Sequence, residues 1–254
     1  MKRLLSILSL LFAVSFLSFA ANELPQSPSG LQEQVLTRTG FTVSWNRDTK
    51  CPNWVAWDLT AEEASAKAAS REEDFYTDPD ARLCPDTRDY SRSGYDRGHM
   101  APAADMKWSP EAMYESFYLS NICPQNRELN GGLWLELEQR CRVYAKRYGT
   151  LWICCGPVFG KNPKTIGQAG VSVPEAFFKV VLMQYKGEYK AIGFLLPNEP
   201  LDVQEDIFNY RKDIPEIEKL TGLVFFKDVP LEAKKAKSEF DRFPWDIQWS
   251  KPKK

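Results

Sequence analysis

The chain contains a single histidine, His99, in the sequence Asp96-Arg97-Gly98-His99. One histidine excludes zinc sites built from several imidazoles and reactions that need two histidines. An imidazole with its ordinary pKa of about 6.5 is neutral near pH 7 and can accept a proton from water. A neighbouring carboxylate and guanidinium are costly to bury without a purpose, and the glycine allows close approach of the backbone. His99 is therefore a candidate functional residue, against the plainer alternative of a polar residue that is merely satisfied where it lies.

A second cluster of polar residues begins at Asn130, just before or in the first turn of a clear helical pattern over 133–148 that Gly149 ends. Steps of four residues lead from Asn130 to Glu138 and Arg142, each step advancing by about 40° around the helix. These three side chains can therefore face one cleft. A helix-capping asparagine followed by a Glu–Arg pair explains the same spacing equally well.

The elements that must position these residues follow from apolar periodicity. A hairpin is expected where residues 41–45 and 54–57 alternate, and a helix is expected over 60–73, with Thr60 and Glu63 forming a capping box. Further strands are expected at 151–155, 176–183 and 189–196, and further helices at 202–211 and 214–221. Hairpins outnumber strand–helix–strand units. This order indicates an α+β fold with a mainly antiparallel sheet flanked by helices.

The first twenty residues are set apart from this fold. Lys2 and Arg3 precede an apolar run over 4–19, and small residues then occupy the two positions that a signal peptidase reads. The run is short for a membrane anchor and no basic stop-transfer segment follows it. We therefore expect a cleaved signal peptide at 1–20, a single domain at 21–254, and export to the periplasm or the external medium without stable membrane association.

The charge balance excludes binding through an overall basic field. The chain holds 33 basic and 34 acidic residues; without residues 1–20, which hold two basic and no acidic residues, 31 and 34 remain, a net charge of -3. A phosphate-bearing partner then needs a local cationic patch or a metal ion. Candidates for such a patch lie near the end of the helical pattern, although the last two also suit a helix carboxyl end: Arg140, Arg142, Lys146 and Arg147.

Six cysteines in a chain expected to be exported predict at least one or two disulfides. They are Cys51, Cys84, Cys123, Cys141, Cys154 and Cys155. Six cysteines allow fifteen full pairings, and the sequence does not choose among them. Adjacent residues of a strand point to opposite faces, so we expect different surroundings for Cys154 and Cys155.

Taken together, the two polar clusters resemble the DNA/RNA non-specific endonuclease family, the ββα-metal nucleases that are endonuclease G-like. The resemblance is carried by these stretches: Asp96-Arg97-Gly98-His99-Met100-Ala101-Pro102-Ala103-Ala104-Asp105, Phe117-Tyr118-Leu119-Ser120-Asn121, and Leu129-Asn130, Trp134, Leu137-Glu138 and Arg142 at the family's spacing. It covers nearly the whole chain after residue 20. The fold that it implies is a hairpin and a metal-binding helix, a ββα-metal finger, within a larger antiparallel sheet.

Roles for individual residues are implied by this resemblance. His99 would be the general base, Asn130 the direct ligand of a catalytic Mg²⁺, and Glu138 a group that holds water of that ion. Arg97 and Arg142 would contact phosphate. The chemistry is consistent, because Mg²⁺ keeps most of its waters and one amide oxygen suffices to anchor it, while arginine suits bidentate phosphate contact.

Arg71 resembles another phosphate-facing arginine of the family, but two extra residues separate it from its landmark at Thr77-Asp78-Pro79. The function implied is hydrolysis of single- or double-stranded DNA and RNA with little sequence preference, giving 5′-phosphate ends, with Mn²⁺ or another divalent cation as alternatives to Mg²⁺. A catalytically silent nucleic-acid binding or uptake protein on the same scaffold is the alternative function. The oligomeric state is left open, a homodimer included.

Overall fold

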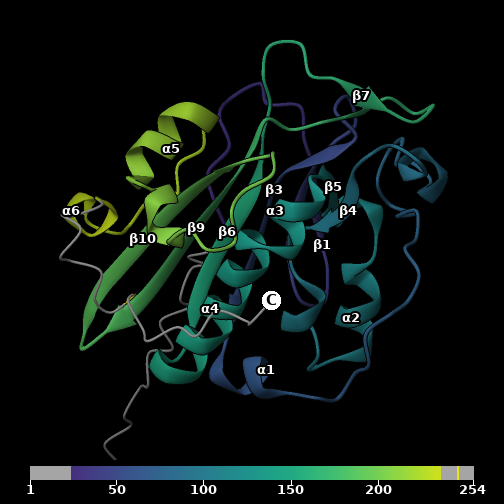
Figure 1. Cartoon of the computed structure of the whole chain (residues 1–254). Coiled ribbons are helices and arrows are strands. Elements are labelled where there is room, and N and C mark those ends of the chain that lie inside the picture. The colour runs from purple at the N-terminus through teal and green to yellow at the C-terminus, as the bar shows by residue number, and fades with distance from the viewer. Residues whose placement is uncertain (1–23, 236–244, 246–254) are drawn as a thin grey trace, which may run out of the picture.

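The computed structural model describes residues 24–235 and residue 245. The segment expected to be a signal peptide, residues 1–20, lies outside these residues. A seven-stranded sheet forms the centre of the described chain, and its neighbouring strands are all antiparallel (Figure 1). The α+β class with a mainly antiparallel sheet is thereby confirmed.

The strand order of this sheet is β1-β2-β3-β6-β9-β10-β11. These strands are β1 (Gln34–Thr37), β2 (Thr42–Asn46), β3 (Cys51–Leu59), β6 (Leu151–Val158), β9 (Ala176–Tyr185), β10 (Glu188–Pro197) and β11 (Arg211–Lys212). Two small two-stranded sheets lie outside it: β4 (Asp96–His99) with β5 (Ile122–Gln125), and β7 (Thr165–Ile166) with β8 (Val171–Ser172). The predicted hairpin is β2–β3, and the three predicted later strands are β6, β9 and β10.

Helices cover both faces of the sheet (Figure 1). They are α1 (Ala61–Ser65), α2 (Pro110–Ser116), α3 (Arg127–Gly131), α4 (Leu133–Tyr148), α5 (Ile214–Thr221) and α6 (Leu231–Lys234). Short 3-10 turns occupy Thr87–Tyr90, Ala103–Asp105, Leu119–Asn121 and Ile207–Tyr210. The two helices predicted over 133–148 and 214–221 have those bounds in the structure.

The sheet separates two hydrophobic cores. Because successive residues of a strand point to opposite faces, Cys155 of β6 packs in the core that includes α4, and Cys154 packs in the core that includes Ile214 and Ile217 of α5. The expected difference between these two cysteines is confirmed. The core that includes α4 is the larger of the two. It also holds Ile122 of β5, so the β4–β5 hairpin packs against it.

The helix expected over 60–73 is much shorter in the structure. Its beginning is as predicted: the Thr60 hydroxyl accepts from the Glu63 backbone N–H at 3.1 Å, and the Glu63 carboxylate accepts from the Thr60 N–H at 2.8 Å. After α1 the alanine-rich segment leaves the helix, and the Ala69 N–H donates to the Lys107 carbonyl at 3.0 Å. A tertiary hydrogen bond therefore replaces the intrahelical one, a contact that helix propensity cannot foresee.

The helix expected over 202–211 is also absent. Its place is taken by the 3-10 turn at 207–210, which begins where the Asp206 carboxylate accepts from the Phe208 N–H at 3.0 Å. The next two residues form β11 at the edge of the large sheet, with Phe194 of β10 opposite Arg211. Pairing with the sheet edge therefore decides the conformation of this segment.

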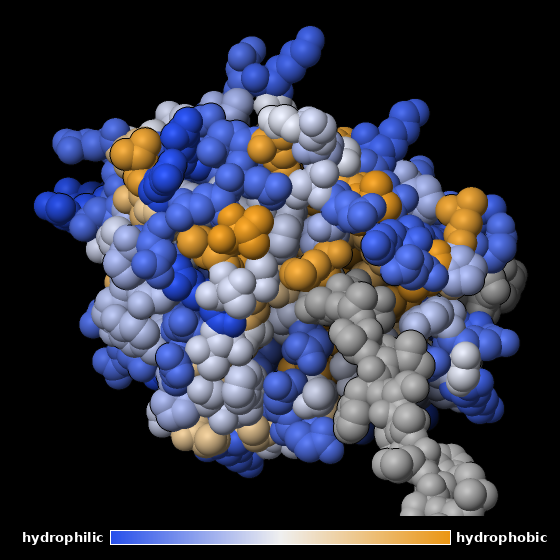
Figure 2. Space-filling view, turned by 180° about the vertical axis from the view of Figure 1, so that it is seen from behind, coloured by the Kyte–Doolittle hydropathy of each residue, from blue (hydrophilic) through white to orange (hydrophobic). Residues whose placement is uncertain are grey.

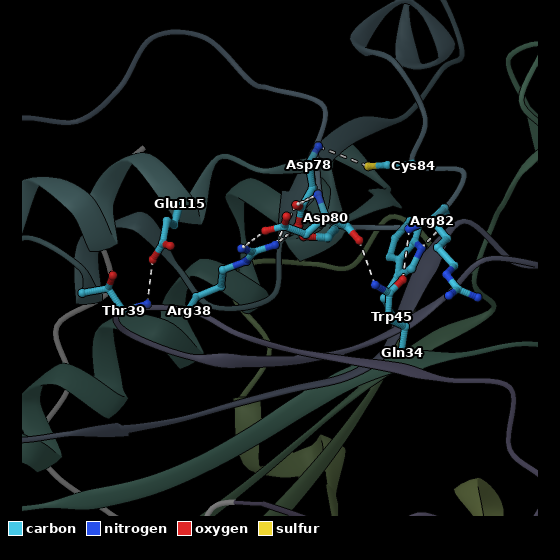
Figure 3. Close-up of polar contacts among 10 residues, drawn as sticks. Gln34, Arg38, Thr39, Trp45, Asp78, Asp80, Arg82, Cys84 and Glu115 are labelled. Carbon is cyan, nitrogen blue, oxygen red and sulfur yellow. Dashed lines mark hydrogen bonds and ion pairs between the residues drawn. The ribbon is translucent and has the colours of Figure 1, made fainter.

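A buried ion-pair cluster fastens the segment that leads to the site onto the first strands (Figure 3). The Arg38 guanidinium, after β1, donates to both carboxylate oxygens of Asp78 at 2.6 and 2.7 Å and to Asp80 at 2.8 Å. The Ser120 hydroxyl donates to the same Asp78 carboxylate. The Trp45 indole N–H donates to the Arg82 carbonyl at 2.9 Å. These contacts fix the long loop between α1 and β4 against the sheet.

The expected disulfides are not formed: all six cysteines are thiols in the structure. Five of them are buried, and burial raises the pKa of the Cys141 and Cys155 thiols to about 12. They serve as small apolar residues of the core, the usual role of an unbridged buried cysteine.

Within residues 24–235 and 245, no helix is long and apolar enough to cross a membrane. On the face seen in Figure 2, hydrophobic side chains form small separate patches among hydrophilic ones. Exposed large hydrophobic residues of this kind occur on most soluble folds and do not by themselves define a site.

Candidate active site

The hairpin of β4 and β5 carries His99 at its end. His99 pairs with Ile122, and Gly98 pairs with Cys123. Glycine is required here, because a Cβ at Gly98 would lie 2.2 Å from the Gln125 Oε1 and 2.6 Å from its Cβ. The close packing of the Gln125 side chain on Gly98 therefore sets the position from which the His99 imidazole projects.

The His99 side chain is only 8% exposed and lies between two aromatic rings. Its ring centroid is 5.3 Å from that of Phe75 and 4.8 Å from that of Phe117, the latter in an edge-on arrangement. Among the described residues, the buried Nε2 of His99 has no hydrogen-bond partner. A buried imidazole nitrogen without a partner is costly unless a ligand or water completes it, so this nitrogen is the one available to a substrate or water.

Burial, together with the smaller effect of the positive charge of Arg71, lowers the pKa of His99 to about 3. The imidazole is therefore neutral throughout the physiological pH range. A neutral imidazole has one nitrogen that can accept a proton, which is the state that a general base must have before reaction.

The backbone of His99 is held from the other side by α4. The Trp134 indole N–H donates to the His99 carbonyl at 3.3 Å, and both groups are buried. This bond connects the first turn of α4 to the end of β4. The hairpin and the helix are therefore fixed relative to each other at the candidate base.

Asn130 lies in α3, a helix separate from the strong helix α4. It lies just before the first turn of α4, as expected, and a break at Gly132, where φ is -110° and ψ is -113°, separates the two helices. A Cβ at Gly132 would lie 2.4 Å from the Glu128 carbonyl oxygen. The glycine therefore permits a sharp change of direction between the two helices.

The Asn130 amide is oriented by β4. Its Nδ2 donates to the Asp96 Oδ2 at 3.2 Å. A carboxylate can only accept, so the amide nitrogen must face Asp96, which leaves the Asn130 Oδ1 free for another contact. Asp96 also pairs with the exposed Arg127 at 3.2 Å. Asn126, whose side chain caps α3 by accepting from the Glu128 N–H at 2.9 Å, positions the start of the helix.

A cleft of about 690 Å³ opens beside this hairpin and α3. Its lining includes Phe75, Tyr95, Asp96, Arg97, Arg127 and Asn130. Two of the predicted site residues, Arg97 and Asn130, thus share one cleft. His99, Glu138 and Arg142 do not line it in this structure; His99 lies behind Phe75, which forms part of the cleft wall.

Glu138 is buried in α4 at 8% exposure. Burial raises the pKa of its carboxyl to about 7, while the charges of Lys179, Arg142 and Arg71 oppose that rise. The carboxyl therefore changes its charge close to neutral pH. Arg71 influences the pKa values of both Glu138 and His99, so these three groups belong to one electrostatic neighbourhood.

Arg142 is held by a buried acid instead of facing the cleft. Its Nη1 lies 2.7 Å from the Asp105 Oδ1, and the Trp57 indole N–H donates to the other Asp105 oxygen at 3.2 Å. Burial raises the pKa of Asp105, and Arg142 opposes that rise. The expectation that Arg142 faces one cleft together with Asn130 is therefore wrong for this structure, because Asp105 satisfies the guanidinium.

The predicted cationic patch near the end of α4 is also corrected. Arg140 is 5% exposed and donates to Glu136 at 2.9 Å, an ion pair between residues four apart on the helix. Arg142 is paired with Asp105 as described. Two of the four expected cations are therefore consumed by internal pairs, and the surface patch does not form.

Two arginines are placed at aromatic rings of the site. The Arg97 guanidinium lies 4.5 Å from the Phe75 ring centroid, and that of Arg71 lies 5.1 Å from the Phe117 ring centroid. Both residues are exposed. Since Phe75 and Phe117 are the two rings against His99, the structure brings both arginines to the vicinity of the candidate base. Arg71 therefore lies near the candidate base despite the two extra residues that separate it from its sequence landmark.

The residues present fit a small hard cation. No group of three or more histidine, cysteine or acidic side chains capable of holding a metal occurs within residues 24–235 and 245. The free Asn130 Oδ1 and the neighbouring Asp96 carboxylate are oxygen donors at the cleft. Oxygen ligands in small number suit Mg²⁺, which retains several waters, and do not suit Zn²⁺.

Several residues that build the site were not singled out from the sequence: Asp96 as the partner of Asn130, Asp105, Phe75 and Lys179. Asp96 and Asp105 are the first and last residues of the His99 stretch that resembles the family, and this position could have marked them as site residues. Phe75 and Lys179 come from a loop and from β9, far along the chain from the motif. Only the tertiary fold brings them to His99 and Glu138.

A hairpin that ends in a histidine and is followed by a helix carrying an asparagine defines a site of the ββα-metal nuclease class. The chain belongs to the DNA/RNA non-specific endonuclease family, whose model matches residues 20–232. This family comprises nucleic-acid-hydrolysing enzymes that depend on a divalent metal ion. The resemblance drawn from the sequence motifs is confirmed.

Relatives of this chain support the same family assignment. The mitochondrial nuclease of Saccharomyces cerevisiae is 36% identical over 221 residues, covering 78% of this chain and 67% of its own length. The mitochondrial nuclease EXOG of Xenopus laevis is 35% identical, covering 80% and 63%. Human mitochondrial endonuclease G is 32% identical, covering 77% and 70%. The chain thus spans about two thirds of the length of these relatives.

The prediction of export is contradicted by these comparisons. The yeast, frog and human relatives carry names that place them in mitochondria, which points away from the periplasm or the external medium. The apolar run that suggested a signal peptide lies in residues outside the described part of the chain. An apolar amino-terminal segment after basic residues is thus an insufficient signal of export for this chain.

A solved structure shows the same fold. The crystal structure of the EndoG/EndoGI complex matches with a TM-score of 0.74 and 29% identity, covering 78% of this chain and 87% of the matched chain. The predicted ββα-metal finger within a mainly antiparallel sheet is therefore confirmed at the level of the fold.

Proposed function

We propose that this chain is an endonuclease that hydrolyses the phosphodiester bonds of DNA and RNA, with His99 as general base. The observation that carries this proposal is the buried Nε2 of His99, which has no hydrogen-bond partner among the described residues, on a strand whose Asp96 also accepts from the Asn130 amide of the cleft. The family match and the nuclease names of the relatives support the reaction class.

His99 would take a proton from the attacking water. Its pKa of about 3 keeps the ring neutral, and its backbone is anchored by Trp134, so the acceptor nitrogen has a fixed place. A low pKa weakens a base in isolation. The proton would be accepted as negative charge develops nearby on the phosphate, and that charge raises the proton affinity of the ring.

Asn130 would hold the divalent cation through its free Oδ1, with Asp96 fixing the amide. The cation, for which Mg²⁺ is the best candidate and Mn²⁺ an alternative, would supply positive charge to the scissile phosphate and the departing 3′ oxygen. Glu138, in its ionised form, would orient water of the ion. Its carboxyl pKa of about 7 requires a pH near or above neutrality for that form to predominate.

The exposed arginines Arg71 and Arg97 would bind phosphate, since both lie at the rings that surround His99 and neither is paired with an acid in the described structure. Arg142 would act less directly, because Asp105 holds it and its charge favours the ionised form of Glu138. Contacts to phosphate and metal carry no base information, so little sequence preference is expected. We also propose that residues 21–254 form a single endonuclease domain.

A nuclease assay tests this proposal. Purified protein is incubated with supercoiled plasmid and, separately, with ribosomal RNA in millimolar Mg²⁺, with and without a chelator. Cleavage of both substrates that stops with chelator, and whose fragments carry 5′-phosphate ends, is the expected result. His99→Ala should lower the rate by about 10²–10⁴-fold while binding is retained. A gel shift without cleavage by the unaltered chain would favour the alternative, a binding protein on this scaffold.

A further inference from the structure

Lys179 is an unusual residue in the core of this protein. It lies in β9 and is fully buried, with Cys155 of β6 and Phe194 of β10 opposite it in the sheet. Among the described residues its Nζ has no hydrogen-bond partner. A buried ammonium without a partner is costly, and a methionine or leucine would fill the same space without that cost. A lysine here therefore calls for a reason other than packing.

The ammonium group lies on the faces of two indoles. Its Nζ is 4.4 Å from the Trp134 ring centroid and 5.3 Å from the Trp57 ring centroid. Both distances are within the range of a cation–π attraction, which is stronger when the cation is removed from water. One charge therefore holds two large rings, one from α4 and one from β3.

Each indole has its N–H directed to a part of the site. The Trp134 N–H donates to the His99 carbonyl at 3.3 Å. The Trp57 N–H donates to the Asp105 carboxylate at 3.2 Å, and Asp105 pairs with Arg142 at 2.7 Å. Lys179 thus contacts both the indole that holds the His99 backbone and the indole that holds the Asp105–Arg142 pair.

We propose that Lys179 is a positioning residue for the nuclease reaction, which holds the indoles of Trp57 and Trp134 so that their N–H groups fix His99 and the Asp105–Arg142 pair. The inference rests on the proposed function of His99. The attraction between a cation and the face of an aromatic ring depends on the positive charge. A neutral side chain of the same volume would fill the space but would not attract the two rings in this way.

The charges near Lys179 agree with this assignment. Its positive charge lowers the pKa values of two buried acids, Glu138 and Asp105, against the effect of their burial. Arg142 acts in the same direction on both acids. Removal of Lys179 therefore takes away one of the positive charges that favour the ionised form of each acid.

The test compares the unaltered protein with Lys179→Met, which keeps the length and volume but removes the charge, and with Lys179→Gln. Replacing a buried, unpaired charge by an apolar residue is often neutral or stabilising, so thermal unfolding should show a folded protein with an unchanged or higher Tm. We expect kcat on plasmid to fall by about 10–100-fold, because a small misplacement of catalytic groups has an effect of this size. KM should stay within about twofold, because the exposed arginines remain.

A second measurement does not depend on activity. The chain has one histidine, so the ring signals in a carbon–proton NMR spectrum of untagged protein belong to His99 without assignment. Lys179→Met should shift or broaden these signals. Trp134→Phe, which keeps a ring but removes the N–H, should do the same, whereas Trp57→Phe should leave them in place. Lys190→Met on the neighbouring strand, where the lysine pairs with Glu188 at 2.9 Å, is the matched control and should change neither readout.

The outcomes separate this proposal from the proposed function. A folded Lys179→Met protein with unaltered kcat and unaltered His99 signals would overturn the positioning role while His99→Ala still abolished cleavage. A lowered Tm with kcat restored at low temperature would mark Lys179 as structural only and would overturn it too. If the unaltered chain shows no cleavage, the proposed function fails, and the NMR comparison still decides whether Lys179 holds His99.

Discussion

The amide nitrogen of Asn130 and the carboxylate of Asp96 are joined at 3.2 Å, across the junction of α3 and β4. This bond decides which end of the amide faces the cleft, because the carboxylate accepts only from the nitrogen. The residue that would bind the metal is therefore oriented by a neighbour on the hairpin that carries His99. Groups that orient metal ligands commonly matter nearly as much as the ligands themselves.

Asp96→Ala should weaken divalent metal binding by about 10–100-fold, the usual effect of losing a group that orients a metal ligand. Binding is measured by titration of Mn²⁺ followed by electron paramagnetic resonance, so that no turnover is needed. Arg127→Ala is the matched control, since Arg127 is the other partner of Asp96 but its side chain is 81% exposed. An exposed pair contributes little, so this variant should bind Mn²⁺ normally. Equal losses in both variants would contradict the orienting role of the Asn130 bond.

Arg71→Ala should raise the pKa of His99. The charge of Arg71 is the second cause of the low pKa after burial, so its removal should move the value upward from about 3 without reaching the ordinary value. The pKa is read from the NMR titration of the single histidine in untagged protein. Arg97→Ala is the control, because Arg97 does not contribute to this shift although it also lies against a ring of the site. No change with Arg71→Ala would place that side chain away from the imidazole in solution.

Glu138→Gln should stabilise the protein above neutral pH while removing most of its activity. The folded-state pKa of about 7 lies above the ordinary value, so the ionised carboxylate opposes folding. The unfavourable contribution is absent below about pH 4.5, grows as the pH rises toward 7, and is complete above it, to a limit of about 3 kcal/mol. Chemical unfolding at pH 5 and pH 8.5, with chelator present, gives the comparison.

At pH 5 the two proteins should be similarly stable, and at pH 8.5 Glu138→Gln should be the more stable. The same ionisation predicts that kcat of the unaltered enzyme rises with pH through the neutral range. A Gln variant that is less stable at pH 8.5 would show that the carboxylate is stabilised by its cationic neighbours more than it is penalised by burial.

Much of the architecture could be predicted because its signals are local. Helix α5, the strands β2, β3, β6, β9 and β10 of the large sheet, and the Thr60–Glu63 capping box follow from periodicity and from side chains a few residues apart. The segment after Ser65 could not be predicted in this way. Its conformation depends on Ala69 meeting Lys107, and no propensity encodes that meeting.

The same distinction between local signals and tertiary contacts applies to the site. The residue types of His99 and Asn130 and their motif indicated the chemistry, and the family match confirms the class. The direction in which a long side chain points was not accessible, because Arg142 turns to Asp105, a residue whose burial depends on Trp57 from a distant strand. The six cysteines misled for a different reason: their count was interpreted through an expected oxidising environment, whereas burial in the core accounts for them.

Gly132→Ala should damage the site through the backbone alone. The chain changes direction at this residue between α3 and α4, and the added carbon would lie 2.4 Å from the Glu128 carbonyl oxygen. We expect a loss of about 1–3 kcal/mol of unfolding free energy from this clash, and weaker Mn²⁺ binding because α3 carries Asn130.

Gly131→Ala is the matched control for this variant. Gly131 precedes Gly132 within α3, and nothing lies within 4 Å of the position that its Cβ would take. An alanine in a helix is favoured over glycine by about 0.5–1 kcal/mol, so this variant should be as stable as the unaltered protein or slightly more stable, with metal binding retained. Equal behaviour of the two alanine variants would mean that the break between α3 and α4 does not depend on Gly132, and that Asn130 is positioned by its contact with Asp96 alone.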